Sequence, residues 1–211
     1  MQMGTLKNSK KTRDKLIEAA GLLFAKRGFN VVTVRDIVNQ AKVPLSSINY
    51  HFGTKQILYR EVLLEACKDV STSYVDQKKL LNIEPYEALY IFINESIKLY
   101  KSDFVSRWKV ALITRECWDP SNVFDDVMKE YLKPEADFMA TLISRIVDKP
   151  LAHFQIRFAV VTLVGLLDSF SSYGRYINGV APGLENYLSN NDLLAKQIYQ
   201  IIINLVEASA S

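Results

Sequence analysis

A short stretch near the amino end carries side chains suited to contact with DNA. Small hydroxyls, an amide and a phenol follow one another in Leu45-Ser-Ser-Ile-Asn-Tyr-His51, whereas a helix that only faces water more often carries Lys and Glu. Such groups can bond base edges and phosphates in a major groove. Asn49 and Ser46 are the candidates for base contacts. The candidates for phosphate contacts are Arg35, Tyr50, His51 and Lys55.

Two short helices joined by a tight turn would position these side chains. Thr33 can cap the first helix, and Asp36 three residues later completes a capping box. Apolar residues then share one helical face: Val34, Ile37, Val38 and Ala41. After the turn at 42–44, Ile48 and Phe52 lie four apart on the inward side of the second helix. The pattern predicts a helix-turn-helix that reads DNA.

Four segments around this motif strengthen the interpretation: Thr12–Ala20, Leu23–Phe29, Thr33–Ile37 and Tyr50–Lys55. Together they resemble the N-terminal DNA-binding domain of TetR-family transcriptional regulators, over roughly residues 10–65. The resemblance implies that these residues lie at or near the DNA: Thr33, Arg35, Leu45, Ser46, Ser47, Asn49, Tyr50, His51 and Lys55. Two positions depart from many members of the family, because Lys42 stands where they have Gly and Pro44 where they have Ser. Lys42 must then adopt the turn without the freedom of glycine.

The charge of the chain is unevenly distributed. Residues 1–60 contain 11 Lys and Arg against 3 Asp and Glu, a net charge of +8, and the remainder contains 15 against 20, a net charge of −5. The basic excess thus surrounds the helix-turn-helix, where phosphates would need neutralising. Lys7, Lys10, Lys11 and Arg13 form a basic arm at the amino end, ahead of a first helix expected from Ser9 or Thr12 to Arg27.

The periodicity of apolar residues predicts an all-α chain. Gly28 should end the first helix, and Thr54 should cap a long helix that starts at Lys55 and continues to about Tyr74. Further helices are expected at 85–100, 104–116, 122–132, 135–147, 152–176 and 190–207, with a loop from Asn178 to Asn186. We expect a helix-turn-helix domain at residues 1–54 and a helical bundle for ligand binding and dimerisation at residues 55–211.

The larger domain is rich in aromatic residues. Thr114-Arg-Glu, Pro120, Val127, Pro134 and Leu142-Ile143 are similar in spacing to the ligand-side domain of the CecR-like subgroup of TetR regulators. A pocket for an apolar or aromatic effector could be lined by Tyr100, Phe104, Trp108, Arg115, Trp118, Phe138 and Tyr173. The alternative is that these rings simply fill the core.

The last two long helices provide a candidate surface for dimerisation. The apolar residues expected there are Phe158, Val161, Gly165, Phe170, Ile198, Ile201, Ile202 and Leu205. About half of such positions should instead face the core of the subunit. A two-fold dimer would present two reading helices to a palindromic operator on double-stranded DNA.

The sequence indicates no catalytic constellation, cofactor motif or metal site. Its two histidines, His51 and His153, and its two cysteines, Cys67 and Cys117, have no ligand spacing, and the free cysteines fit a reducing cytoplasm. A ligand-responsive repressor is therefore expected. Two alternatives are a DNA-bound structural or division-type protein without an effector, and a helical small-molecule-binding protein or enzyme whose helix-turn-helix is vestigial.

Overall fold

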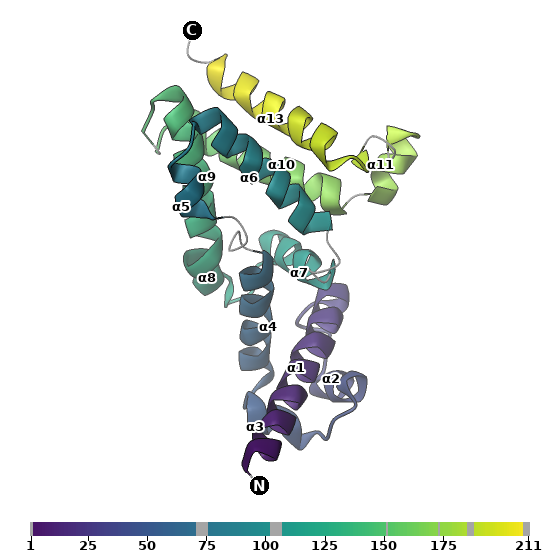
Figure 1. The fold of residues 1–211 in the computed structure, drawn as a ribbon. Helices are drawn as coiled ribbons and strands as arrows, with labels where there is room; N and C mark the ends of the chain where they lie inside the picture. Colours follow the sequence, from purple (N-terminus) through teal and green to yellow (C-terminus); the bar gives the residue numbers. More distant parts are fainter. Residues whose placement is uncertain are drawn as a thin grey trace. The chain divides into compact units, whose positions relative to one another are not determined.

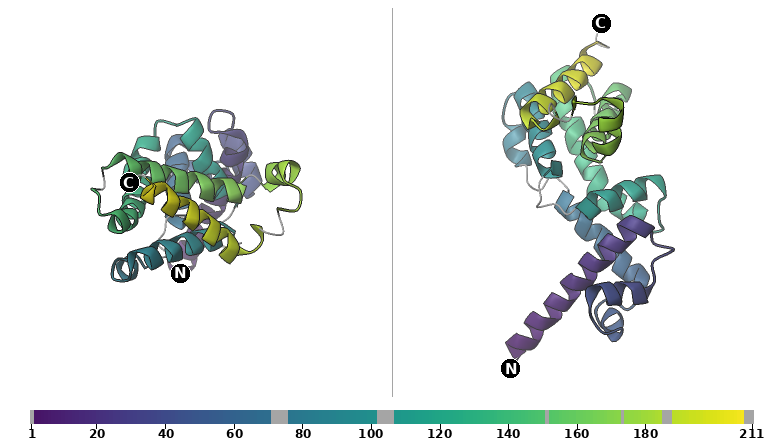
Figure 2. Two further views of the ribbon diagram at one scale, coloured as in Figure 1. Left: turned by 90° about the horizontal axis from the view of Figure 1, so that it is seen from above. Right: turned by 90° about the vertical axis from the view of Figure 1, so that its right-hand side faces the viewer.

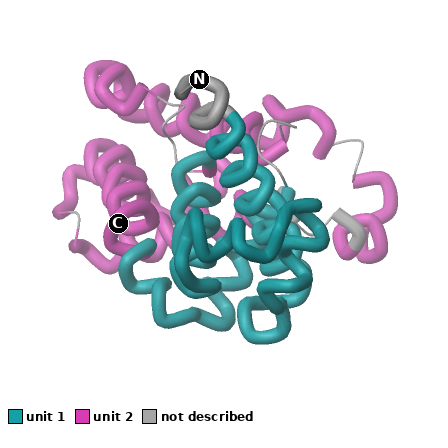
Figure 3. The backbone as a smooth tube through the Cα atoms, turned by 90° about the horizontal axis from the view of Figure 1, so that it is seen from below, with its two compact units in different colours: residues 1–69, 106–127 teal, residues 70–105, 128–211 magenta. Residues whose placement is uncertain are grey.

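The fold is described from a computed structural model of the chain, in which residues 2–70, 76–101, 107–150, 152–172, 174–184 and 188–208 are described. Throughout these residues the regular structure is helical, which confirms the all-α prediction (Figure 1). The helices form two compact units, residues 1–69 with 106–127 and residues 70–105 with 128–211 (Figure 3). We describe each unit by itself.

Unit 1 contains six helices among its described residues: α1 (Gln2–Arg27), α2 (Val34–Ala41), α3 (Ser46–His51), α4 (Lys55–Val70, whose last residue falls to unit 2), α7 (Arg107–Trp118) and α8 (Phe124–Val127). Its core is built from the inner faces of these helices. Leu16, Ala20 and Phe24 are fully buried on α1. Ile37 of α2 and Ile48 of α3 are buried with them, so the helix-turn-helix is held by ordinary hydrophobic burial.

Helix α1 begins earlier than the sequence predicted. It starts at Gln2 rather than at Ser9 or Thr12, and Figure 2 shows it as one long helix. The hydroxyl of Thr12 does not cap a helix start but donates to the Asn8 carbonyl, 3.0 Å away, within the helix. The other end is as predicted: Gly28 has a φ of +80°, and its N–H donates to the Phe24 carbonyl at 2.8 Å.

Helix α7 packs against α1 although about eighty residues separate them in sequence. The indole Nε1 of Trp108 donates to Glu18 Oε1 at 2.9 Å, and Lys109 pairs with Asp69 of α4. The contacts therefore divide the chain differently from the predicted boundary after residue 54. The predicted boundary follows the sequence motif, whereas the packed unit also includes the helices that cover α1 and α4.

Unit 2 is built from α5 (Gln77–Leu81), α6 (Pro85–Lys101), a π-helical turn η1 (Met128–Leu132), α9 (Lys133–Val147), α10 (Phe154–Ser172), α11 (Gly174–Val180) and α13 (Asn191–Glu207). Its core joins α6, α9, α10 and α13. Two tyrosines fix α13 on α6: Tyr86 bonds Glu207 at 3.0 Å, and Tyr90 bonds Asp192.

Several helix predictions in unit 2 hold and one does not. Asn190 caps α13 by accepting from the Leu193 N–H at 3.1 Å, and α6 and α9 lie where the apolar pattern placed them. The single helix expected at 152–176 instead ends at Ser172. Asn178 and Gly179, expected in a loop, belong to α11. No helix among the described residues combines the length and apolarity that a membrane span requires.

Candidate DNA-binding surface

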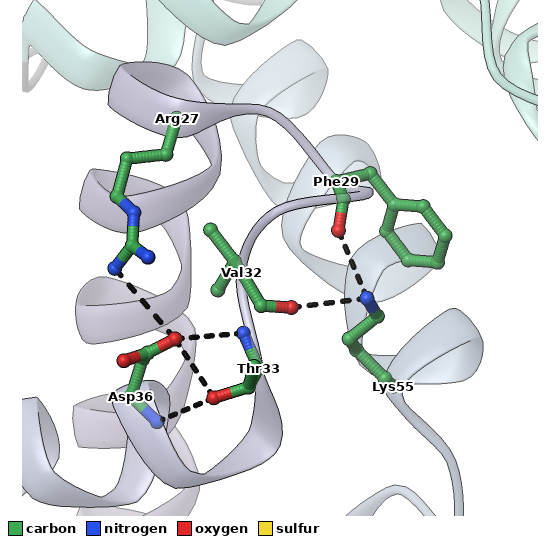
Figure 4. A network of polar contacts seen from close by, with 6 residues as sticks. All are labelled: Arg27, Phe29, Val32, Thr33, Asp36 and Lys55. Atoms are coloured by element: carbon green, nitrogen blue, oxygen red, sulfur yellow. Dashed lines mark hydrogen bonds and ion pairs between the residues drawn. The ribbon is translucent and has the colours of Figure 1, made fainter.

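The first helix of the reading motif is capped as predicted. The Thr33 N–H donates to Asp36 Oδ2 at 2.9 Å, and the Asp36 N–H donates to Thr33 Oγ1 at 3.2 Å (Figure 4). Arg27 approaches the same carboxylate at 3.6 Å. The hydrogen bonds from Thr33, followed by the charge of Arg27, lower the pKa of Asp36. Thr33 is thus committed to starting α2, and Arg35 beside it is exposed.

The turn between the two helices requires a left-handed residue. Lys42 occupies that position, with φ 54° and ψ 51°. The Val43 N–H donates to the Val38 carbonyl at 3.1 Å, which closes α2. A non-glycine residue in this conformation costs about 1 kcal/mol, so the turn is held by the packing on either side of it.

Helix α3 is anchored on one side and exposed on the other. Ile48 and Phe52 are 1% and 5% exposed, whereas Tyr50 is 77% exposed. Leu45, Ser46 and Asn49 are also exposed, and Ser47 and His51 are half-buried. In place of a side-chain cap, the Ser47 N–H donates to the Pro44 carbonyl at 3.0 Å. The predicted base-reading residues therefore lie together on one free polar face.

Lys55 has protein partners that the sequence did not suggest. Gly53 ends α3 with a φ of +75°, and Thr54 Oγ1 accepts from the Ile57 N–H at 3.2 Å, so α4 starts as predicted. The Lys55 ammonium donates to the carbonyls of Phe29 and Val32 at 2.9 and 3.0 Å (Figure 4). It also lies 4.2 Å from the centre of the Phe29 ring. Lys55 ties the α1–α2 loop to α4, and a phosphate contact by its third N–H stays a prediction.

A buried polar network in unit 1 was missed by the sequence interpretation. The Tyr59 hydroxyl donates to Glu116 Oε1, and the Ser121 N–H and Oγ donate to Glu116 Oε2 at 3.1 and 2.8 Å. Burial raises the pKa of Tyr59, and the hydrogen bond to Glu116 adds to the effect. These bonds connect α4 to the end of α7. Because Tyr59 and Glu116 are far apart in sequence, only the charge of Glu116 amid apolar residues hinted at a buried partner.

The residues predicted to line an effector pocket are divided between the two units. Trp108, Arg115 and Trp118 are on α7 in unit 1: Trp108 is buried against α1, the Arg115 guanidinium lies beside Gly28, and Trp118 is 80% exposed. Tyr100 and Phe138 belong to unit 2, where Phe138 packs on Phe92 with ring centres 5.8 Å apart. Phe104 and Tyr173 lie outside the described residues.

Unit 2 contains an apolar hollow of about 10 Å³ between α6, α10 and α13. Tyr100 is the predicted pocket residue that lines it, together with Ile97, Lys101, Leu167, Phe170, Leu194 and Ile198. The Lys101 ammonium bonds Asn191 Oδ1 at 3.0 Å and the Leu188 carbonyl. A drug-sized ligand needs several hundred Å³, so this hollow would have to widen before it could hold one.

The predicted dimer residues divide between surface and core. Val161 is 70% exposed, Phe158 and Ile201 are about half exposed, and Gly165 has open space around it. Phe170 and Leu205 are half-buried against the core of unit 2. Ile198 and Ile202 are fully buried within the subunit, so their assignment to a dimer surface is wrong. They occupy the inward face of α13, where α6 and α10 cover them.

No group of three or more His, Cys, Asp or Glu side chains that could hold a metal ion comes together in the described part of the chain. His51 stacks edge-on with Tyr50, with ring centres 4.8 Å apart, at the end of α3.

Comparisons with known protein families cover both parts of the sequence. Residues 16–62 match the family described as bacterial regulatory proteins of the TetR family. Residues 85–182 match the C-terminal domain of the HTH-type transcriptional dual regulator CecR. The first match spans α2, α3 and the start of α4, where the polar face lies.

Individual relatives agree with the two family matches. The chain is 25% identical over 149 residues to the probable HTH-type transcriptional regulator YttP of Bacillus subtilis, covering 68% of this chain and 71% of YttP. It is 29% identical over 85 residues to IcaR of Staphylococcus aureus, described as the negative transcriptional regulator of the biofilm operon icaADBC. That match spans 40% of this chain and 45% of IcaR.

Solved structures share the fold at low sequence identity. The hemolysin II transcriptional regulator HlyIIR superposes with a TM-score of 0.66 at 17% identity, covering 92% of this chain and 97% of that one. The TetR-family regulator PfmR from Thermus thermophilus gives a TM-score of 0.62 at 17% identity, with coverages of 89% and 96%. At this identity the likeness shows the arrangement of helices alone.

Proposed function

Because the chain belongs to the TetR family of bacterial transcriptional regulators and has a CecR-like C-terminal domain, we propose that it is a homodimeric repressor. In this proposal it binds a palindromic operator and is released by a small-molecule effector. TetR-family regulators are not enzymes.

The exposed polar face of α3 is the observation that carries the proposal. Ile48 and Phe52 fix the helix from below, which leaves Ser46, Asn49 and Tyr50 free to enter a major groove. Asn49 can bond adenine with both ends of its amide. The exposed Arg35 and the half-buried His51 are the candidates for neighbouring phosphates.

An exposed apolar stripe on α10 supports the dimer. Phe154, Phe158 and Val161 are spaced at helical intervals, are 75%, 49% and 70% exposed, and are followed by the open Gly165. The rings of Phe154 and Phe158 stack with centres 5.8 Å apart. Apolar groups arranged in this way favour burial against another surface. A second copy would place two α3 helices about 34 Å apart, one turn of DNA.

Repression is supported by a relative rather than by the structure. IcaR is described as a negative regulator, and the 85 matched residues carry the resemblance. Effector release would require a population shift, in which the effector binds better to a conformation unsuited to DNA. A 100-fold loss of operator affinity needs about 2.7 kcal/mol of coupling.

One observation favours a second candidate. The hollow between α6, α10 and α13 holds about 10 Å³, which is less than an effector occupies. A TetR-fold protein that binds DNA without any effector, as a structural or division-type factor, would need no ligand-sized hollow between these three helices. The two candidates differ in whether a small molecule can release the DNA.

The DNA-binding part of the proposal can be tested without knowing the operator. Duplexes that bind the protein are selected from a randomised pool, and affinities for the selected and a scrambled duplex are measured by fluorescence anisotropy. Asn49→Ala should weaken binding to the selected duplex by about 1–3 kcal/mol, roughly 5- to 150-fold, while scarcely changing binding to the scrambled one. Asn122→Ala removes an exposed amide from the α7–α8 turn and should change neither.

The effector can be sought with the same selected duplex. A library of apolar and aromatic small molecules is screened for loss of the anisotropy signal, and each positive compound is checked for binding to the protein alone. Release by a compound that binds the protein supports the repressor. Retention of the duplex throughout the library, with preserved sequence preference, would support the effector-free candidate.

A further inference from the structure

The amino-terminal part of α1 runs past the reading helix. Helix α1 begins at Gln2, eleven residues before Arg13, which corresponds to roughly 16 Å of helix. Within this part of the helix the Thr12 hydroxyl donates to the Asn8 carbonyl one turn earlier. Figure 1 shows the amino end of α1 and α3 at the same end of unit 1.

Arg13 fixes this extension against the reading motif. Its guanidinium Nη2 pairs with Glu61 Oε2 of α4 at 2.8 Å. The guanidinium carbon lies 5.5 Å from the centre of the Phe52 ring, directly after α3. Arg13 thus contacts Phe52, which follows α3, and Glu61 of α4. Its positive charge is paired with a carboxylate within unit 1. The basic arm expected from the sequence is therefore held by Arg13 at its base.

Two lysines on the extension carry exposed charges, Lys10 near the side of Arg13 and Lys11 on a different side of the helix. Lys10 and Lys11 are both exposed, and no ion pair of either is found among the described residues. Lys10 precedes Arg13 by three residues, so both lie on nearby sides of the helix, one turn or about 4.5 Å apart along its axis. Lys10 is thus exposed one helical turn from the Arg13 that contacts Phe52, towards the amino end of α1.

We propose that Lys10 and Lys11 bind phosphates of the duplex flanking the bases that α3 reads. The proposal rests on the proposed DNA-binding function and extends its footprint outward from each half-site. Lysine ammonium groups make point contacts with phosphates that carry no base information. The lysines would thus add affinity, salt dependence and length of site, while the choice of sequence stays with α3.

The test uses the selected duplex and the double variant Lys10→Gln/Lys11→Gln. Glutamine has nearly the helix propensity of lysine, so α1 should persist, which circular dichroism checks. The matched control is Lys26→Gln, which removes an exposed charge near the other end of the same helix. Affinities are measured by anisotropy across a salt series for the full-length protein. They are measured on a long duplex and on one cut back to the two half-sites.

We expect the double variant to weaken binding to the long duplex and to flatten its salt dependence. The slope of log affinity against log salt should fall by about 1 for each phosphate that is no longer neutralised. The ratio of affinities for selected and scrambled duplexes should stay unchanged, as should the slope for Lys26→Gln. On the short duplex the wild-type protein and the double variant should bind with equal affinity.

Two results overturn different claims. A double variant that binds the long duplex with the wild-type slope, or an equal drop in affinity on long and short duplexes, refutes the binding of flanking phosphates. A wild-type protein that binds no duplex above background refutes the DNA-binding function itself. Hydroxyl-radical footprints supply a further check, since the double variant should lose protection only at the outer edges of the site.

Discussion

The indole ring of Trp108 occupies the space that a side chain at Gly21 would need. A β-carbon built on Gly21 would overlap three atoms of the ring. The ring is held in place by the bond from its Nε1 to Glu18 Oε1, one turn earlier on α1. Close approach of α1 and α7 in unit 1 thus depends on a residue without a side chain in the middle of a helix.

Replacing Gly21 by alanine should therefore destabilise unit 1. Alanine improves helix propensity by up to about 1 kcal/mol, but the overlap with Trp108 should cost more, giving a net loss of about 1–3 kcal/mol. Urea unfolding followed by circular dichroism measures the change. Gly179→Ala is the control, because its β-carbon would meet nothing within 4 Å. An equal stability for both variants would contradict the close approach of the two helices.

The left-handed turn residue Lys42 offers the opposite experiment. Lys42→Gly should raise the free energy of unfolding by up to about 1 kcal/mol, since glycine adopts a φ of +54° without steric cost. Lys42→Ala removes the same charge but keeps the strain, so it should not stabilise. If the two variants unfolded at the same urea concentration, the strain at Lys42 would be negligible.

Local signals in the sequence were sufficient for the reading motif. The Thr33–Asp36 capping box, the stop at Gly28 and the four-residue spacing of Ile48 and Phe52 all act over one helical turn, and the structure contains each. Because these features are local, a single sequence predicts them well. The arrangement of the exposed face of α3 followed from the same spacing.

Long-range packing was beyond the sequence. The sequence around an aromatic residue such as Trp108 does not show whether the ring lines a ligand pocket or fills the interface between two helices. In the structure the ring packs against Gly21, which is far away in sequence. Ile198 and Ile201 belong to one apolar helix, yet the first is fully buried and the second 45% exposed. Periodicity finds the apolar residues of a helix but does not say which neighbour covers them.

Glu135 should make the stability of unit 2 depend on pH. Burial raises its pKa from 4.5 to about 7, so the folded state favours the protonated carboxyl. The contribution to stability is complete below the unfolded pKa of 4.5 and is lost as the pH rises through 7. Glu135→Gln should thus be more stable than the wild type at pH 8, by about 1–3 kcal/mol, and similar at about pH 4.5.

Thermal unfolding at several pH values would show this dependence. Glu130→Gln, which replaces an exposed carboxylate on the preceding turn, is the control and should follow the wild type throughout. A Glu135→Gln variant that tracks the wild type from acidic pH to about pH 8 would show that the carboxyl is solvated in the folded state.

The proposed dimer can be tested by introducing one charged side chain into the exposed stripe on α10. Val161 is 70% exposed in the subunit, so Val161→Lys should leave the fold intact while burying a charge in any interface formed there. Sedimentation should show a shift from dimer towards monomer. Val31→Lys, at an apolar residue of unit 1 that is 58% exposed, should not alter the assembly. An unchanged dimer in the first variant would place the interface elsewhere.

Residues 106–127 return to unit 1 after the chain has already entered unit 2, so the backbone crosses between the units three times. A chimaera made with one junction after Asp69 would therefore inherit a foreign α7 beneath α1. It would also lose the Glu116 carboxylate that bonds Tyr59. To transfer the DNA specificity of such a regulator, a graft must include residues 1–69 and 106–127 together. Natural recombination at a single point should therefore rarely yield working hybrids.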